Sequence, residues 1–307
     1  MNHSLSRQAR SAKKRGAHSG SRSREALVPY LFIAPFVVMF LVFFLIPAVY
    51  SLYISFCNYA GFGPMTFLGL SNFKAIFHFN FFWKAIGNTL FYYIWHTIPV
   101  MVLSFLLAVI LSSRSVRYKR FFKVSIFLPV TMSSVAATLI WKVILGTRSG
   151  AINTFLGTSI PFIDSSTLFR WSVVIILVWK SVGWFMMVYM SGLTTIDHEI
   201  YEAAKVDGAG PLRSMTLITI PLMKPIFMFA FLIDTMSSLK LFTEPRLLAA
   251  TGSVAPVTNT IVGILVDYMN AGRFGMASAV GWALFIMISG LSVIQFMAFT
   301  KRSKTDV

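Results

Sequence analysis

Long apolar stretches alternate with short polar segments along most of the chain. No charged residue occurs from Ala26 to Phe73, and about 20 apolar residues are enough to cross a bilayer as a helix. The pattern predicts an all-α integral membrane protein with six transmembrane helices. We expect these spans at residues 28–56, 85–111, 122–145, 171–193, 222–242 and 276–300. Internal prolines such as Pro47 and Pro129 are expected to kink them.

Composition and charge support the same class. Of 307 residues, 56% are hydrophobic and 12% charged, a balance far from that of soluble domains. The net charge of +17 suggests nucleic-acid binding, because basic chains bind phosphate backbones. However, the basic residues cluster beside the apolar stretches, as they do in the cytoplasmic loops of membrane proteins. We therefore expect membrane lipid and no nucleic acid as a partner.

The distribution of Lys and Arg predicts the orientation of the spans. Eighteen fall in one set of segments: 1–28, 112–123, 194–224 and 301–307. Six fall in the alternate set: 57–84, 146–170 and 244–275. Because cytoplasmic loops carry the excess, both termini are expected in the cytoplasm, including the short C-terminus at 301–307. The basic tail at 1–28 is expected to be disordered, and it either fixes the topology or binds anionic lipid.

A polar loop at residues 195–221 separates the fourth and fifth predicted spans. Apolar residues recur about one helical turn apart in its first half: Ile196, Ile200, Ala203 and Ala204. Gly208 then permits a sharp change of direction, and Pro211 can open a second short helix. A polar, kinked helix between two spans requires a partner surface. The charge distribution places this loop in the cytoplasm, where ATP is available.

Parts of this loop stand at characteristic offsets, namely Glu202-Ala-Ala204, Gly208 and Ile218-Thr-Ile-Pro221. The spacing resembles the loop by which ABC importer permeases dock onto their ATPase subunits. Outer segments around Asn72, Asn88 and Asn153 are also similar to carbohydrate-importer permeases, although each asparagine alone fits an ordinary cap or turn. Over residues 29–300 the chain resembles the maltose and glycerol-phosphate family, which implies a type I ABC importer permease fold.

The resemblance implies a set of docking residues on the loop: Tyr201, Glu202, Ala203, Ala204, Asp207 and Gly208. In this interpretation Glu202 is a polar anchor for a basic group of the ATPase, the two alanines allow close approach, and Gly208 sets the bend. The chain departs from the family pattern at Asp197, where proline is usual, and at residues 251–256, where the usual Gly-Gly-Pro is missing.

Ionisable residues within spans are costly and by default face a cavity or a partner charge. Lys142 and Lys240 lie near the predicted outer ends and can extend to the interface. Lys180 and Asp234 are central, and we expect them to face a polar cavity or to pair with each other. With Trp184, which either stacks on a sugar ring or only packs, the candidate translocation-pathway residues are Lys180, Trp184, Asp234 and Lys240.

The resemblance implies the permease subunit of an ATP-driven, binding-protein-dependent importer in the bacterial cell membrane. The solute would be a sugar, an oligosaccharide or a glycerol-phosphate-like compound. The implied partners are a second homologous permease, two ATPase subunits and an extracytoplasmic substrate-binding protein. An ABC permease for a non-carbohydrate solute and an ATP-independent secondary transporter are alternatives, although no repeated half supports the latter.

We expect no catalytic residues in this chain. The sequence has no Gly-x-x-x-x-Gly-Lys-Ser/Thr motif, so ATP and Mg²⁺ are expected to be used by partner subunits, and no cofactor is expected here. The five histidines are scattered and lack metal-ligand spacing. Because Cys57 is the single cysteine, a disulfide within the chain is impossible.

Overall fold

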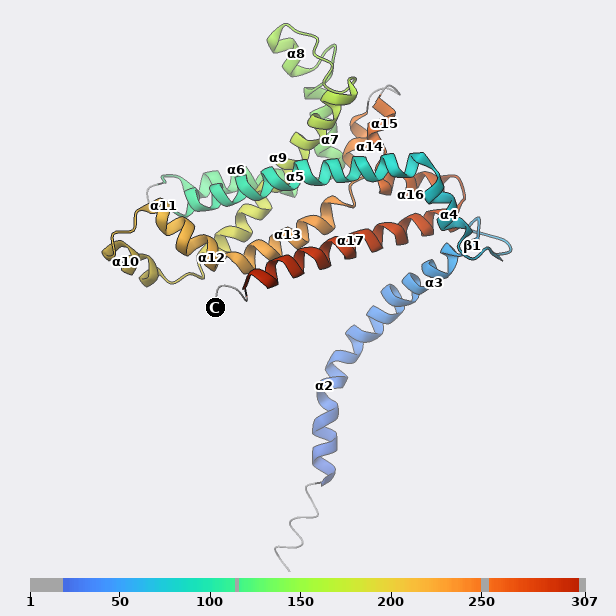
Figure 1. Cartoon of the computed structure of the whole chain (residues 1–307), viewed down its shortest axis with the longest axis horizontal. Helices are drawn as coiled ribbons and strands as arrows, with labels where there is room; N and C mark the ends of the chain where they lie inside the picture. Colours follow the sequence, from blue (N-terminus) through green and yellow to red (C-terminus); the bar gives the residue numbers. More distant parts are fainter. Residues whose placement is uncertain (1–18, 114–115, 250–253, 304–307) are drawn as a thin grey trace, which may run out of the picture. The chain divides into compact units, whose positions relative to one another are not determined.

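The computed structural model describes residues 19–113, 116–249 and 254–303. Residues 1–18 of the predicted tail, residues 304–307 and residues 251–253 of the departing segment lie outside this description. The chain divides into two units, residues 1–54 and 55–307. Each unit is described by itself (Figure 1).

The described part of the first unit is one long helix made of α2 (Ser19–Phe40), η1 (Leu41–Leu45) and the start of α3 (Ile46–Ser55). In the π-helical turn η1, the Ile46 N–H bonds to the carbonyl of Leu41. Proline at position 47 explains this wider turn, because its ring would clash with a carbonyl of an unbroken α-helix. Residues 19–28, which we predicted to be disordered, belong to α2, because the apolar helix continues into residues that tolerate helical structure.

The second unit is a helical bundle with one small sheet. The elements before the polar loop are β1 (Cys57–Asn58), β2 (Thr66–Phe67), α4 (Ser71–His78), α5 (Asn80–Ser112), α6 (Lys119–Thr131), α7 (Ser134–Ile144), α8 (Ala151–Leu156) and α9 (Ser166–Leu193). Those that follow are α10 (His198–Val206), α11 (Pro211–Ser214), η2 (Met215–Thr219), α12 (Ile220–Leu222), α13 (Lys224–Ser238), α14 (Thr243–Leu248), α15 (Ala255–Thr258), α16 (Ile261–Asn270) and α17 (Phe274–Ser303). The strands pair antiparallel, with Cys57 opposite Phe67.

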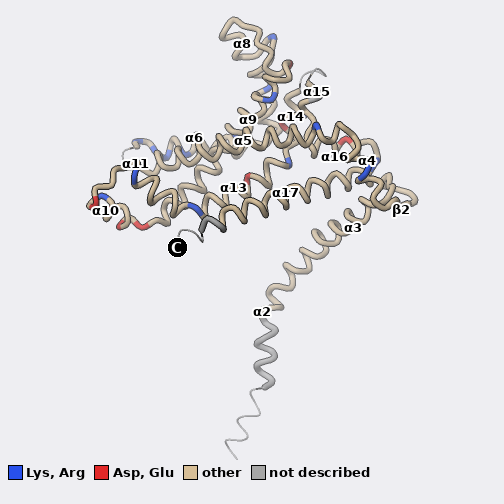
Figure 2. The backbone as a smooth tube through the Cα atoms, viewed as in Figure 1, with Lys and Arg blue, Asp and Glu red and all other residues tan. Residues whose placement is uncertain are grey.

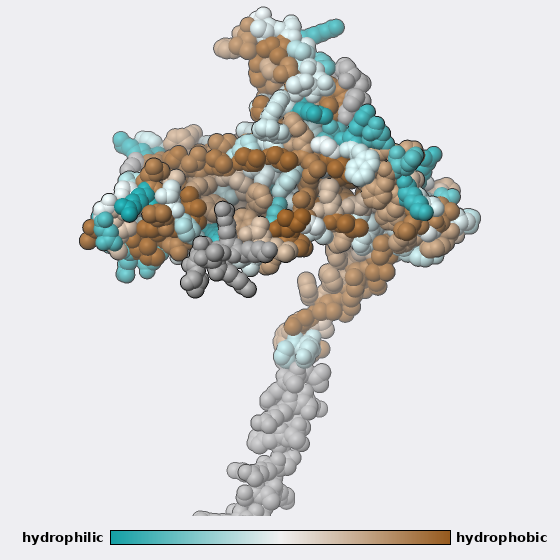
Figure 3. Space-filling model, viewed as in Figure 1, coloured by the Kyte–Doolittle hydropathy of each residue, from teal (hydrophilic) through white to brown (hydrophobic). Residues whose placement is uncertain are grey.

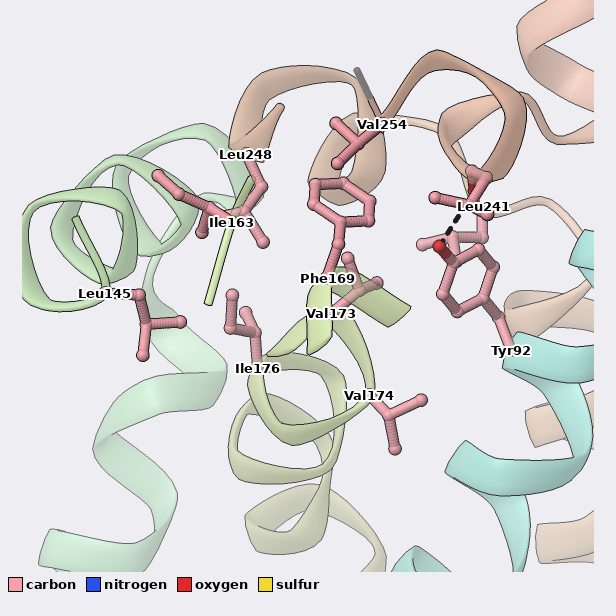
Figure 4. Close-up of a cluster of buried hydrophobic side chains, with 11 residues drawn as sticks. Tyr92, Leu145, Ile163, Phe169, Val173, Val174, Ile176, Leu241, Leu248 and Val254 are labelled. Carbon is pink, nitrogen blue, oxygen red and sulfur yellow. Dashed lines mark hydrogen bonds between the residues drawn. The ribbon is translucent and has the colours of Figure 1, made fainter. Parts of the chain in front are cut away.

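The bundle is built around α9, which packs along α5 and against α6 and α13. One apolar cluster surrounds the first half of α9, where Phe169, Val173 and Ile176 meet Leu248 of α14 (Figure 4). A second cluster fills the space between the later halves of α5 and α9, and a third joins α4, α16 and α17. The sequence of α9 is apolar on several sides because the helix is surrounded.

Four of the described helices are long and apolar enough to span a membrane, and two bent helix pairs bring the total to six if each pair is one span. The predicted span at 122–145 is one such pair, because α6 and α7 meet at 101°. Pro129 lies in the last turn of α6, and Met132 and Ser133 are extended. The Ser133 hydroxyl then caps α7 by accepting a hydrogen bond from the Ala136 N–H at 3.1 Å.

The second bent pair lies at the predicted fifth span. Residues Pro211–Leu222 meet α13 at 65°, and η2 stands immediately before Ile220 and Pro221, with the Ile220 N–H bonded to the Met215 carbonyl. The π turn accommodates the proline as η1 does in the first unit. The continuous helix α13 ends at Ser238, so the chain at residues 239–242 turns away instead of extending the span.

Several loops of the second unit lie at two opposite ends of the bundle, whereas α7 and α8 project from its side (Figure 1). In Figure 1, α10–α12 lie at one end with the start of α6 and the end of α17, whereas α4, β1 and α16 lie at the other. Charged residues concentrate at these ends, and long uncharged stretches of α5 and α17 run between them (Figure 2). Hydrophobic side chains cover the flank along α5 (Figure 3).

Three buried asparagines tie segments together rather than cap helices. The side-chain amide of Asn72 donates to the Cys57 carbonyl at 2.8 Å, and that of Asn88 donates to the Asn259 carbonyl at 2.9 Å. Asn153 donates to three carbonyls of its own loop. Each satisfies backbone groups that would otherwise be buried without a partner.

The contact between α9 and α6 depends on Gly183. A Cβ atom there would lie 2.3 Å from the Ile126 carbonyl oxygen, whereas one at Gly290 of α17 would meet nothing within 4 Å. We expect Gly183→Ala to cost about 1–3 kcal/mol by overpacking and Gly290→Ala to cost nothing. Thermal unfolding of both purified variants in the same detergent measures the difference, and equal stability would show that α6 does not pack this closely.

Candidate functional site

A cavity of about 470 Å³ opens inside the second unit. Its walls come from α5, α9, α13 and the start of α14, with one residue each from α6 and α7. All four residues that the sequence assigns to the translocation pathway line it: Lys180, Trp184, Asp234 and Lys240. The structure thus brings together residues from α9, α13 and the turn after α13 that are up to 60 positions apart in the chain.

Asp234 is the most deeply buried of the four, with 1% of its surface exposed. Its Oδ2 accepts a hydrogen bond from the Thr97 hydroxyl at 2.5 Å, and its Oδ1 accepts one from Ser238 at 3.3 Å. The His96 Nδ1 lies 3.6 Å from the same Oδ1. Two residues of α5 therefore hold a carboxyl group of α13, which joins these helices beside the cavity.

The His96 ring extends this network to α9. Its Nε2 lies 3.2 Å from the Ser181 hydroxyl, and its Nδ1 lies 3.0 Å from the Ser238 hydroxyl. His96 is itself buried. A polar group at this depth would be costly without such partners, so the network stabilises the contact of three helices and presents polar atoms to the cavity.

Lys180 does not pair with Asp234. Its Nζ lies 3.6 Å from Glu244 Oε1 of α14 and donates a hydrogen bond to the Ser134 hydroxyl of α7. Of the two sequence hypotheses for Lys180 and Asp234, the structure therefore agrees with a shared cavity and contradicts the direct pair. The reason is geometric, since each group finds a nearer partner on a third helix.

The two remaining lysines differ from each other. Lys142 Nζ, which we expected to extend to the interface, donates to the carbonyls of Leu247 and Ala249 at 2.8 and 3.1 Å. Lys240 is an exposed lining residue of the cavity. Lys142 therefore binds the end of α14, and Lys240 faces the cavity.

Sequence reasoning missed His96, Thr97 and Glu244. The signal for His96 was available, because a histidine in the middle of an apolar span is as unusual there as an aspartate. Thr97 carried no signal, since threonine is common in such helices. Glu244 follows the predicted end of the fifth span and would have been noticed only if α14 had been predicted as a buried helix.

The loop at 195–221 folds as two helical pieces around a turn, α10 and α11. The side chain of Asp197 caps α10 by accepting a hydrogen bond from the Glu199 N–H at 3.1 Å. The Ala209 N–H bonds to the Ala204 carbonyl at 2.8 Å and the Gly208 N–H to the Lys205 carbonyl at 3.1 Å. This pair of bonds is a Schellman end, and it requires the positive φ of +75° at Gly208.

The predicted docking residues lie on two sides of α10. Ala204 is buried, and the Tyr201 hydroxyl lies 2.9 Å from that of Thr219, which fixes α10 to η2. Glu202, Ala203, Asp207 and Gly208 are exposed. Tyr201 and Ala204 thus position α10, while the other four are available to a partner.

Large apolar side chains are exposed on the same loop. Val206 is 88% exposed and Leu212 is 73% exposed, although both lie outside the predicted spans. Leu212 lines a groove of about 1030 Å³ between α10, α11, η2 and the ends of α5 and α9. Apolar residues exposed on a polar loop are typical of a protein–protein contact.

The chain matches a known family along most of its length. Residues 68–303 match the model of the binding-protein-dependent transport system inner membrane component. The chain belongs to this family. It is therefore a permease component of a binding-protein-dependent importer and a multi-pass protein of the bacterial inner membrane, which confirms the resemblance found in its sequence.

Two relatives align over nearly the whole chain. The arabinooligosaccharides transport system permease protein of Bacillus subtilis (strain 168) is 31% identical over 289 residues, covering 92% of this chain and 91% of the relative. The lactose transport system permease protein of Rhizobium radiobacter is 31% identical over 284 residues, covering 89% and 94%.

One solved structure shows the fold. A chain of a bacterial ABC transporter involved in the import of the acidic polysaccharide alginate superposes with a TM-score of 0.81 at 21% identity, covering 92% of this chain and 98% of that one. The bundle with its two bent helix pairs is therefore the fold of an ABC importer.

The buried network predicts an unequal cost for two similar substitutions. Asp234→Asn keeps the shape but disturbs hydrogen bonds from Thr97 and Ser238, and we expect a loss of about 2–4 kcal/mol. The control is Asp267→Asn, whose partner Arg246 lies at 2.8 Å in an exposed pair that contributes about 0–1 kcal/mol. Thermal unfolding in detergent compares them. Equal losses would contradict the network as a main link between α5 and α13.

Proposed function

We propose that the chain conducts a carbohydrate through the cavity between α5, α9 and α13. The observation that carries this proposal is a cavity with polar groups on several walls inside an apolar bundle. Sugar hydroxyls that leave water need replacement hydrogen bonds, which Lys240, Ser237 and the His96 network can supply. Trp184 offers a ring face for stacking on a pyranose. Two relatives are named for arabinooligosaccharides and lactose, which supports this class of solute.

The described residues enclose the cavity only in part. We propose that a second, homologous permease completes it, so that this chain forms half of the pathway. A substrate-binding protein would deliver solute at the end near α4 and α16. The distribution of Lys and Arg supports the orientation with α10–α12 and both termini in the cytoplasm.

ATP hydrolysis is proposed to occur in two partner subunits, with this chain as a non-catalytic component that binds no nucleotide. The exposed face of α10 is the proposed docking surface, with Glu202 as the polar anchor and Ala203 as the point of close approach. Movement of α10 would reach the spans through the Tyr201–Thr219 bond and η2. Rigid-body movement of a docked element is a common form of such coupling.

The docking proposal predicts a difference between two neighbouring glycines. Neither a Cβ at Gly208 nor one at Gly210 would meet an atom within 4 Å, but only Gly208 has a positive φ. Gly208→Ala is therefore expected to strain the end of α10 by about 1–2 kcal/mol and to reduce solute-dependent ATPase activity in the reconstituted importer. Gly210→Ala should leave this ATPase activity unchanged. Glu202→Lys should reduce the activity, because the substitution reverses the charge of the proposed anchor.

Unchanged coupling in both Gly208→Ala and Glu202→Lys would contradict α10 as the docking surface. Co-purification of the ATPase subunits with each variant separates weaker docking from a coupling defect after docking.

The solute is tested by uptake in the reconstituted importer with its own binding protein. We expect labelled arabino- or galacto-oligosaccharides to accumulate, and Lys240→Met and Trp184→Ala to reduce the rate without changing solute binding to the binding protein. Uptake of only non-carbohydrate solutes would reject the proposed class. Uptake that persists without ATP would instead indicate a secondary transporter.

A further inference from the structure

The start of α14 lies at one end of the cavity, and two lysines bind this helix. Its first residues, Thr243 and Glu244, line the cavity together with Phe242. Glu244 is buried, with 6% of its surface exposed. A helix of six residues has too few internal hydrogen bonds to be stable alone, so its position depends on what it contacts.

The beginning of α14 is bound by a charge. Lys180 Nζ of α9 lies 3.6 Å from Glu244 Oε1 and also donates to Ser134 at the start of α7. Only 19% of the Lys180 side chain and 8% of the Glu244 side chain are exposed. Since a buried carboxylate without its partner is costly, the pair fixes Glu244 against α9.

The other end of α14 is bound by a second lysine. Lys142 of α7 donates to the carbonyls of Leu247 and Ala249. The last carbonyls of a helix have no partner within it, and a cation is favourable at that end. The apolar side chain of Leu248 packs beside Ile163 and Val254 between these polar contacts (Figure 4).

The three contacts differ in how easily they are exchanged. If α14 moves away from α7 and α9, solute hydroxyls or water can replace the ion pair and the lysine–carbonyl bonds. The apolar packing forms again when α14 moves back. Lys142 lies on α7 and Lys180 on α9, and α7 departs from α6 at a 101° break. Residues 239–242 connect α14 to α13 as a turn rather than a continuous helix.

We infer that Lys142, Lys180 and Glu244 are positioning residues that latch α14 over this end of the cavity, and that the latch opens when solute passes. In this inference, which rests on the proposed function, Lys180 acts through α14 rather than only on the solute. The end that α14 covers is the outer one in the proposed orientation.

The test uses the cavity residue Ser237, which is exposed. Ser237→Cys is introduced into a Cys57→Ser background, which removes the only native cysteine. The full chain is expressed in its native host with its partner subunits. A membrane-impermeant maleimide added outside then reports how often the cavity is open, through its labelling rate.

We expect Glu244→Gln and Lys142→Met each to raise the labelling rate by about threefold or more, as loss of one partly buried polar contact allows. The exchange Lys180→Glu with Glu244→Lys restores the pair and should return the rate to that of the parent. Arg148→Met, which removes an exposed cation from the loop between α7 and α9, is the matched control and should not change the rate.

Unchanged labelling in both single variants would overturn the latch, as would an exchange variant that labels as fast as Glu244→Gln. Membrane levels of each variant, measured with an affinity tag, exclude misfolding as the cause of a higher rate. The readout needs no transport, so a failure of the carbohydrate assignment in the uptake experiment would leave the labelling result interpretable. Conversely, the uptake experiment can succeed while the latch is rejected.

Discussion

A carboxyl group inside an apolar bundle has to take its hydrogen bonds from neighbouring helices, because lipid supplies none. Asp234 meets this requirement with Thr97 of α5, with His96 of α5 close by, and it also accepts a hydrogen bond from Ser238 of its own helix. These contacts fix α13 against α5 and, through His96, against α9. The cavity lies where the three helices are held together by polar rather than apolar groups, so the same constraint produces both the helix arrangement and the polar lining.

The other intramembrane charges follow from the same requirement. Lys180 and Lys142 find partners on α14, one in a carboxylate and one in backbone carbonyls. As a result, a short helix that could not persist alone is held over the cavity. At the opposite end of the bundle, both ends of α10 are formed by local contacts, the cap at Asp197 and the Schellman end at Gly208.

Much of the fold was predictable from local patterns. The apolar stretches identified six segments, and the positions of glycine and proline gave the form of the loop at 195–221, because caps and turns depend on adjacent residues. The break at Met132 and Ser133 was missed, since Pro129 indicated only a kink. The helix α14 was also missed, because the pattern of its six residues does not distinguish a short buried helix from a loop.

The sequence by itself determined the class and the apolar segments, and it identified Lys142, Lys180 and Asp234 as charges within them. These properties depend on transfer free energies and on the spacing of residues along one helix, and both depend only on residues that are close together in the sequence. The tertiary structure alone decided the partners of those charges: Asp234 with α5, Lys180 with Glu244, and Lys142 with the end of α14. Partner choice depends on which side chains come within about 4 Å, and that distance is set by helix packing over residues that are far apart in the chain.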